Sequence, residues 1–337
     1  MIAPRMSTHW LITRITMATV FATLSAGCGS GSDKTAAAPV TRRLSIATGG
    51  TGGVYYPYGG GIAQVLTTHL PNVEATAEVT AASVDNLKFI KQGTSDIAFT
   101  MADTAQEAVA GRDVFAEYGP VPARALTVLY TNYMHLVTRA DSGITGVRDL
   151  RGKVVSIGTP GGGGTVQAER ILISAGLDPK RDLRPQYLGV AQAVDALKDG
   201  KLDAFFWSGG VPTAAILDLV NTQGVTARLL PLDDVLPALQ KTYGSELYYR
   251  VVIPKDVYRM PADIPVVAVA NMLVVADSMP DQLAYDITRT IFEQQATLAG
   301  IHPQARELAV DKALIGATIP FHPGAIRYFR ERGVWKE

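Results

Sequence analysis

Residues 44–56 read LSIATGGTGGVYY and join a short strand to a glycine-rich turn and the start of a helix. Glycine lets the backbone approach a ligand closely, and the free amides at a helix start can bind a polar or anionic group. Tyr55 and Tyr56 add apolar walls with polar tips. The dinucleotide-binding spacing G-x-G-x-x-G is absent, because Tyr55 stands in place of its third glycine. We interpret the turn as a ligand-binding loop; the alternative is a tight strand-to-helix turn without a ligand.

Strand and helix patterns alternate after this turn. We predict helices over 56–69 and 82–93 and strands over 73–79 and 96–100. Such a β-loop-α-β-α-β order favours a parallel sheet covered by helices. The next stretch, 126–139, is strand-like throughout and long enough to leave one lobe and enter another.

A second series of strands and helices follows. We predict strands over 153–158, 202–207 and 266–275, helices over 165–175 and 192–199, and a mostly helical tail over 281–332. The two series together predict a bilobal α/β fold with two chain crossovers between the lobes. Lobe 1 would comprise 44–130 and 270–337, and lobe 2 would comprise 131–269. Ligands of open α/β sheets bind beyond the carboxyl ends of strands, so we expect a shared cleft there.

A second glycine-rich loop, PGGGGT over 160–165, follows a predicted strand of lobe 2. It lacks the lysine of a phosphate-binding P-loop, so nucleotide hydrolysis is not expected. Bare amides, a helix N-terminus and the hydroxyls of Thr159 and Thr165 would suit a carboxylate. The alternative is a flexible loop without a ligand.

Two further segments carry candidate contacts. The segment WSGGVP over 207–212 again combines an aromatic side chain with bare backbone after a strand. Ser83 and Asn86 stand three residues apart at a predicted helix start. Ser83 could equally cap that helix, and residue type alone does not separate capping from ligand contact.

The composition excludes several classes of protein. The chain has 337 residues, of which 47% are hydrophobic and 18% charged, and its formal net charge is zero. These values fit two globular lobes and offer no basic surface for nucleic acid. The histidines are scattered and form no metal-binding pair, so we predict no catalytic residue, no metal and no cofactor. We expect structural roles for His69 and His322, and a monomer.

Residues 1–28 have the order of a secretory signal. Basic residues precede a weakly apolar run over 15–26, and small residues then lead to Cys28, the single cysteine of the chain. The run is too short to span a bilayer, which takes about 20 residues. The segment SAGC is similar to a lipobox, which predicts lipidation of Cys28 and a flexible membrane tether over 29–43. The alternative is an ordinary signal peptide that is cut nearby.

Several segments, taken together, resemble the TAXI-type solute receptors of TRAP transporters. They are GGTGGVYYPYGGGI (49–62), SVDNL (83–87), DLRGKVV (149–155), LKDGKLDAFF (197–206), IPVVAVAN (264–271) and PFHPGA (320–325). The first is quite specific, and all of them occur in the order of the family over about residues 44–333.

This resemblance implies a periplasmic-binding-protein fold and a location in the periplasm. It implies a TRAP permease in the membrane as partner, driven by an ion gradient, and a small polar ligand, either a glutamate-like amino acid or a dicarboxylate. Carried over by motif, the ligand-binding residues would be Gly49, Thr51, Gly52, Tyr55, Tyr56, Ser83, Asn86, Asp103, His135, Thr159, Gly163, Gly164, Thr165, Trp207 and Pro212.

The chain departs from the family pattern at two places. Gly163 replaces the serine of the usual Gly-Ser-Gly-Thr, and Met101-Ala102-Asp103 replaces Gln-Ser-Asp, so polar groups are missing at both. Two other functions remain open. The chain could be the binding protein of an ABC importer or a two-component sensor, or an enzyme, which would need a paired acid and base or a metal.

Overall fold

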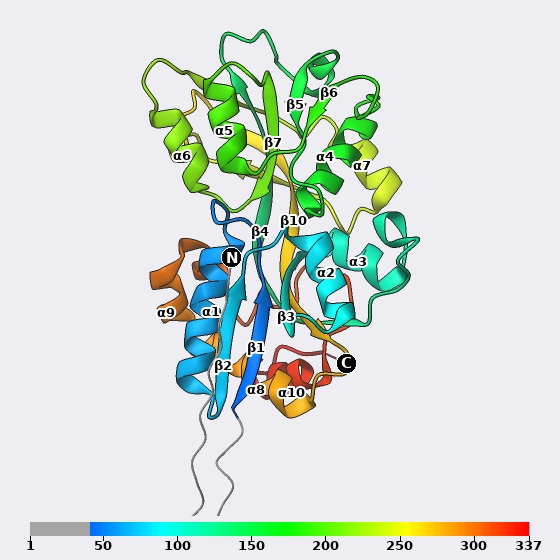
Figure 1. The fold of residues 1–337 in the computed structure, drawn as a ribbon, viewed down its shortest axis with the longest axis vertical. Helices are drawn as coiled ribbons and strands as arrows, with labels where there is room; N and C mark the ends of the chain where they lie inside the picture. The colour runs from blue at the N-terminus through cyan, green and yellow to red at the C-terminus, as the bar shows by residue number, and fades with distance from the viewer. Residues whose placement is uncertain (1–40, 337) are drawn as a thin grey trace, which may run out of the picture. The chain divides into compact units, whose positions relative to one another are not determined.

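A ten-stranded sheet runs through residues 41–336, the part of the chain that the computed structural model describes (Figure 1). The strand order is β2-β1-β3-β10-β4-β7-β5-β6, with β8 paired to β4 and β9 paired to β10. The strands are β1 (Arg42–Ala47), β2 (Val73–Glu78), β3 (Ile97–Met101), β4 (Ala123–Arg139), β5 (Val154–Ser156), β6 (Arg184–Gln186), β7 (Ala204–Gly209), β8 (Ala227–Leu230), β9 (Tyr249–Ile253) and β10 (Ile264–Ala276). The α-helices are α1 (Tyr55–His69), α2 (Ser83–Gln92), α3 (Ala102–Ala110), α4 (Gly163–Ser174), α5 (Val190–Lys198), α6 (Ala214–Asn221), α7 (Leu236–Tyr243), α8 (Asp281–Glu293), α9 (Gln295–Ile301) and α10 (Pro323–Glu331).

Two long strands carry the chain between two lobes, as Figure 1 shows. β10 pairs with β3 over residues 271–275 and with β9 over residues 264–268. β4 lies antiparallel to β10 and continues beside β7 and β8. Because β3 lies in the first lobe and β7, β8 and β9 lie in the second, each long strand is a crossover. The predicted bilobal α/β fold with two crossovers is therefore confirmed.

The first lobe begins with the predicted alternation. β1 is parallel to both β2 and β3, and α1 and α2 connect these strands. β1 starts at Arg42, two residues before the predicted strand. α2 ends at Gly93, whose φ of +69° lies in the left-handed region that favours glycine.

The second lobe repeats this plan around β5, which is parallel to β6 and β7. The predicted helices before and after β6 are confirmed as α4 and α5, each beginning two residues earlier than expected. The sequence interpretation missed β6, β8, β9, α3, α6 and α7. The missed strands have three to five residues, which is too few to show a clear alternation.

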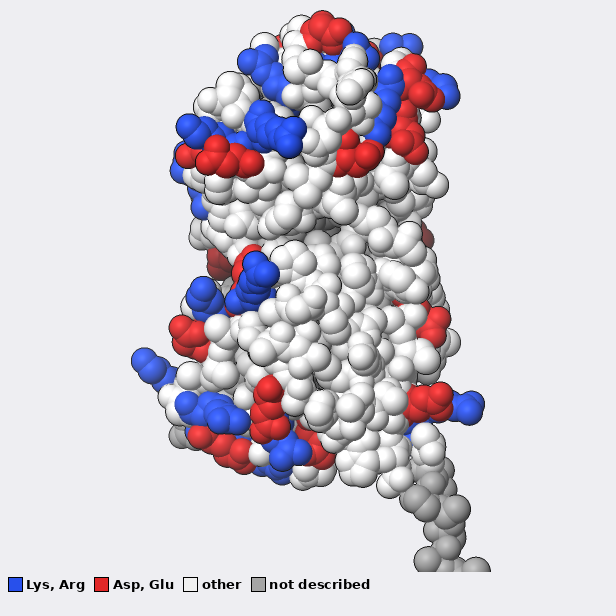
Figure 2. Space-filling view, turned by 90° about the vertical axis from the view of Figure 1, so that its left-hand side faces the viewer, with Lys and Arg blue, Asp and Glu red and all other residues white. Residues whose placement is uncertain are grey.

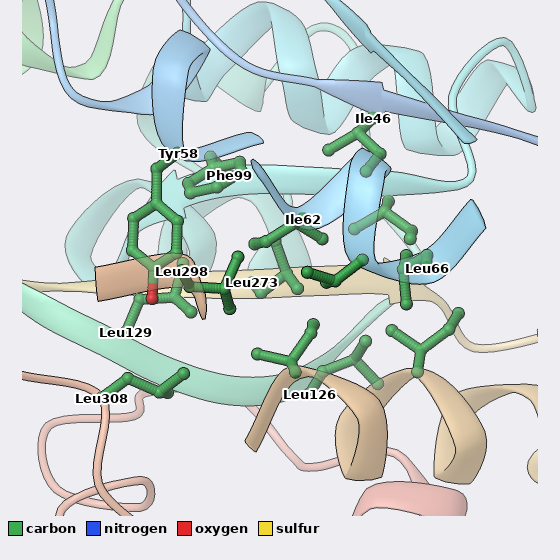
Figure 3. Packing of buried hydrophobic residues seen from close by; sticks show 14 of the residues in the cluster. Ile46, Tyr58, Ile62, Leu66, Phe99, Leu126, Leu129, Leu273, Leu298 and Leu308 are labelled. Atoms are coloured by element: carbon green, nitrogen blue, oxygen red, sulfur yellow. The ribbon is translucent and has the colours of Figure 1, made fainter. Parts of the chain in front are cut away.

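The core of the first lobe fixes α1 against the sheet (Figure 3). Tyr58, Ile62 and Leu66 recur every four residues, lie on one face of α1 and are fully buried. They pack with Ile46 of β1 and Phe99 of β3, and the Tyr58 and Phe99 rings lie 5.8 Å apart. Burying each such side chain contributes about 1.5–3 kcal/mol. This packing holds the N-terminus of α1 at the end of β1.

The C-terminal tail is helical as predicted, except for residues 308–322, which form turns and bends. His322 caps α10 by accepting from the Gly324 amide at 3.2 Å, in line with the expected structural role. None of the helices within residues 41–336 is long and apolar enough to cross a membrane. The predicted signal segment, Cys28 and the tether up to residue 40 lie outside the described residues. The proposed lobe limits stay predictions.

Candidate functional site

A cavity of about 310 Å³ lies between the two lobes and takes its wall from both. The lining residues are Gly49, Gly50, Thr51, Gly52, Gly53, Val54, Tyr55, Thr80, Ala81, Ala82, Ser83, Met101, Tyr130, Asn132, Gly158, Thr159, Gly162, Gly163, Gly164, Thr165, Leu188, Gly189, Val190, Ala191, Gln192, Phe206, Trp207, Ser208 and Gly209. Figure 2 shows a hollow between the lobes, within a band of this face that carries few charged side chains.

Four helices begin at the cavity wall, namely α1, α2, α4 and α5. The amides of their first helical residues have no side-chain acceptor, although Gln192 Oε1 accepts from the Gly189 amide directly before α5 at 3.1 Å. The first amides of a helix have no partner within the helix and carry a partial positive charge. In α4 the amides of Gly163 and Gly164 have no carbonyl partner among the described residues. The wall therefore presents several hydrogen-bond donors to an occupant.

The lobes touch each other on one side of the cavity through α2. The Gly161 carbonyl of the second lobe accepts from the amides of Val84 and Asp85, both at 3.1 Å. The N-terminus of α2 is thus occupied by the other lobe, whereas those of α1, α4 and α5 have no such contact. The structure is accordingly a closed arrangement of the lobes.

A second interlobe contact closes the opposite side. The Trp207 ring covers Gly53, where an added Cβ would lie 3.0 Å from the ring. Trp207 Nε1 donates to Thr213 Oγ1 at 2.9 Å, so the polar tip of the indole is already used. The ring therefore offers the cavity an apolar surface, and the glycine leaves room for the ring.

Charged side chains are absent from the wall. None of the described residues that line the cavity is Asp, Glu, Lys, Arg or His. Polar character comes from backbone amides, hydroxyls and the side-chain amides of Asn132 and Gln192.

Two tyrosines of the cavity wall, Tyr55 and Tyr130, lie beside Asn271, a buried residue that does not line the cavity. Tyr55 donates its hydroxyl hydrogen to Asn271 Oδ1. Asn271 lies between Met101 and Tyr130 in the sheet and pairs with both. The Tyr130 hydroxyl and Asn271 Nδ2 are buried without a hydrogen-bond partner. Burial raises the pKa of Tyr55 and of Tyr130 above the usual value, so both hydroxyls stay protonated.

A buried polar network joins the lobes behind the cavity. Asp103 Oδ2 of α3 accepts from the Tyr248 hydroxyl at 2.7 Å and from Gln167 Nε2 at 3.2 Å. Arg170 of α4 donates to Tyr248 at 3.0 Å and to Asp113 at 2.6 Å. Arg170 is 3% exposed and Asp103 is fully buried, whereas the Asp113 side chain is 42% exposed.

This network also reaches the wall of the cavity. Ser208, a lining residue, donates to Gln167 Oε1 at 2.6 Å, and Asn132 donates to Ser208. A chain of hydrogen bonds therefore leads from the cavity through Gln167 to Asp103. We call Asp103, Gln167, Arg170, Tyr248 and Asp113 the interlobe network.

Most of the ligand-binding residues predicted from the sequence are brought together at the cavity. The predicted residues that line it are Gly49, Thr51, Gly52, Tyr55, Ser83, Thr159, Gly163, Gly164, Thr165 and Trp207. The predicted residues that do not line it are Tyr56, Asn86, Asp103, His135 and Pro212. Ligand contact by any of them stays a prediction.

Asn86 supports the site from behind. It is fully buried, and its Nδ2 donates to the carbonyls of Thr48 at 2.7 Å and Phe99 at 2.8 Å. Its Oδ1 accepts from Thr80 at 2.6 Å. Asn86 therefore joins the carboxyl ends of β1 and β3, from which the first glycine loop and α3 begin.

His135 is likewise a buried support on β4. Its Nδ1 lies 3.0 Å from the Tyr133 carbonyl oxygen and 3.2 Å from that of Trp207, and its Nε2 lies 3.3 Å from the Tyr258 hydroxyl. Burial lowers the pKa of His135 to about 4, although the two carbonyls act in the opposite direction. The imidazole is therefore neutral at neutral pH and holds the backbone beside Trp207.

His135 is expected to make the protein less stable in acid. The usual pKa of histidine is about 6.5. At pH values below it, His135 binds a proton in the unfolded chain but not in the folded chain. The folding stability should therefore be fully present above pH 6.5 and decline by about 3 kcal/mol as the pH falls towards 4. Urea unfolding across this pH range measures the decline in folding stability, and the decline should be smaller in His135→Gln. Equal declines in both proteins would contradict the assignment.

Several lining residues were missed by the sequence interpretation. Tyr130 and Asn132 lie two residues apart on β4. The segment 188–192 contributes the start of α5. The available signals were an asparagine inside a long apolar strand and a glycine, Gly189, directly before a helix.

Comparison with known proteins places the chain in a family. A model of the NMT1-like family matches residues 46–333. The chain belongs to the NMT1-like family. Among solved structures, a protein from Bordetella bronchiseptica RB50 is 18% identical, with a TM-score of 0.50 over 86% of this chain and 88% of that one. This likeness shows that the NMT1-like chain shares that protein's fold.

Other structures resemble the NMT1-like chain more weakly. The periplasmic aliphatic sulphonate binding protein SsuA from Escherichia coli is 17% identical, with a TM-score of 0.47 over 87% of this chain and 84% of that one. Another structure comes from work on glutathione import via GshT and the cystine ABC importer TcyBC of Streptococcus mutans. It is 11% identical, with a TM-score of 0.48 over 85% of this chain and 100% of that one.

Proposed function

We propose that this protein is an extracytoplasmic solute-binding protein that closes two lobes around a small polar organic solute and delivers it to a membrane transporter. The main support is the cavity of about 310 Å³, whose wall comes from both lobes. A solute that contacts both lobes binds the closed arrangement more tightly than the open one and so shifts the protein towards closure.

Binding without chemical turnover fits the wall of this cavity. Its described residues include no carboxylate, imidazole, amine or thiol that could act as an acid, a base or a nucleophile. Uncapped helix N-termini and hydroxyls instead suit a carboxylate group. The first solutes to test are those implied by the TAXI resemblance, a glutamate-like amino acid and a dicarboxylate.

The transporter in this proposal is of the TRAP type, on the strength of the ordered TAXI motifs. A binding protein of an ABC importer is the second candidate, because the same bilobal fold would serve it. Proteoliposomes that contain the cognate permease separate the two. Uptake that needs an ion gradient and no ATP supports the TRAP type, and uptake that needs ATP supports the ABC type.

A periplasmic location and a lipid on Cys28 belong to the same proposal. They rest on the signal-like order of residues 1–28 and on the similarity of SAGC to a lipobox. Loss of membrane association in Cys28→Ser, with export retained, would support the lipid anchor.

Trp207 provides a direct test of the proposed site. Trp207→Ala should weaken solute binding at least about 10-fold, because it removes an apolar wall and the contact with Gly53. Affinity is measured by calorimetry for the solute that gives the largest thermal shift in a panel of amino acids and mono- and dicarboxylates.

Trp335→Ala is the matched control. Trp335 packs on Phe321, with ring centroids 5.6 Å apart, and does not line the cavity. Its replacement should leave solute affinity unchanged. If no solute in the panel raises the melting temperature and none is released on denaturation, the proposed function is contradicted.

A further inference from the structure

The charge of the cavity wall restricts the ligand class more than the family resemblance does. A solute enclosed between the lobes loses much of its hydration, and a buried charge without a partner is costly. An enclosed ammonium group needs a carboxylate or several hydrogen-bond acceptors beside it. No Asp or Glu lines this cavity, so an amino acid would leave its ammonium without a countercharge.

The helix ends at the wall give an occupant hydrogen-bond donors. The N-termini of α1, α4 and α5 open into the cavity without side-chain caps, while Gly161 occupies that of α2. Thr165 uses its hydroxyl hydrogen on the Thr159 carbonyl at 2.6 Å. These helix ends favour a negative group on the ligand.

Two unpartnered side chains support this independently of the helix ends. Tyr130 lines the cavity, is 3% exposed and has no partner for its hydroxyl. Asn271, fully buried beside it in the sheet, does not line the cavity; it accepts from Tyr55 and has no partner for Nδ2. Both free groups can donate a hydrogen bond, and buried donors are rarely left unsatisfied in a working protein.

The rest of the wall is apolar. Trp207, Phe206, Met101 and Leu188 line the cavity, and the indole nitrogen of Trp207 already donates to Thr213. No Lys or Arg is present to balance a second carboxylate. The wall therefore suits one negative group attached to an apolar body.

We infer that the site takes an organic acid with a single carboxylate and no ammonium group, and that it discriminates against amino acids. The inference rests on the proposed solute-binding function and narrows its ligand class. The carboxylate is held by helix N-termini and by the free hydroxyl of Tyr130, and the body of the acid packs against Trp207.

Matched pairs that differ at the ammonium carbon test the inference. Calorimetry on the purified protein compares leucine with 4-methyl-2-oxopentanoate and phenylalanine with phenylpyruvate, with glutamate and glutarate as comparators. In at least one pair the oxo acid should bind at least 10-fold more tightly than its amino acid and more tightly than both comparators.

Three outcomes would overturn the inference. In the first, each amino acid binds as tightly as its oxo acid. In the second, glutamate or glutarate binds more tightly than both oxo acids. In the third, neither oxo acid binds. The proposed function would survive all three as long as some other solute binds, so the two failures are distinguishable.

Tyr130→Phe tests the donor itself. It removes a hydroxyl that has no partner in the protein, so folding should be unaffected. Binding of the preferred oxo acid should weaken about 5- to 10-fold. The matched control is Tyr58→Phe, at a tyrosine whose hydroxyl is also buried without a partner but which does not line the cavity, and it should bind normally. Unchanged affinity in Tyr130→Phe would contradict the assignment of Tyr130 as a donor to the carboxylate.

Discussion

Arg170→Leu is expected to lower the unfolding free energy by about 3–5 kcal/mol, because it leaves the fully buried carboxylate of Asp103 without its countercharge. Arg170 lies 4.0 Å from Asp103, 3.5 Å from Glu107 and 2.6 Å from Asp113. These acids belong to the first lobe and Arg170 to the second, so closure should weaken as well. Urea unfolding measures the first effect, and small-angle scattering should show a larger radius of gyration.

A double variant separates the charge from the packing. Asp103→Asn added to Arg170→Leu should recover at least half of the lost stability, because removing both members of a buried pair is often close to neutral. Tyr248 and Gln167 can still donate to the amide oxygen of an asparagine at this position. A double variant as unstable as Arg170→Leu would contradict the buried-pair explanation.

Arg181→Ala is the exposed control. Arg181 pairs with Asp178 at 2.6 Å, but its side chain is 85% exposed. Exposed pairs contribute about 0–1 kcal/mol, since solvent screens them. A loss in Arg181→Ala similar to that in Arg170→Leu would mean that burial does not determine the effect.

The sequence was informative wherever local pattern determines structure. β1, the turn at Gly49 and α1 follow from a strand pattern, glycines and a helical period within one continuous segment. The strand-like run over 126–139 predicts β4 and is long enough to leave one lobe and enter another, and the apolar run over 266–275 predicts β10. The glycine loops were placed at the cleft because the carboxyl ends of parallel strands share one edge of a sheet.

Local sequence patterns do not predict interactions between segments that are distant in the chain. Asp103, taken from the resemblance as a ligand contact, binds Tyr248, which is 145 residues away in the chain. Nothing near Tyr248 in the sequence marks it as a partner of α3. Tyr130 and Asn271 similarly become neighbours only through the pairing of β4 with β10. Donors and acceptors that meet across lobes depend on this register, which the sequence alone does not define.

Gly163→Val is expected to weaken solute binding about 10- to 100-fold, because the added side chain prevents the lobes from closing. A Cβ at Gly163 would overlap Met101 Cε and lie 2.8 Å from Thr104 Oγ1 and 2.9 Å from Ser83 Cβ. Gly163 belongs to the second lobe, and all three neighbours belong to the first. Overpacking of this kind costs about 1–3 kcal/mol, and the lobes can relieve it by opening.

This explanation predicts that folding survives while closure fails. The melting temperature of the solute-free variant should stay close to that of the wild type, because each lobe keeps its own core. Solute should no longer reduce the radius of gyration of the variant. Gly60→Val is the matched control, since Gly60 lies early in α1 with no atom within 4 Å of an added Cβ and should bind normally. If Gly163→Val binds solute with wild-type affinity, the contact between α4 and the first lobe is not part of the closed, solute-bound state.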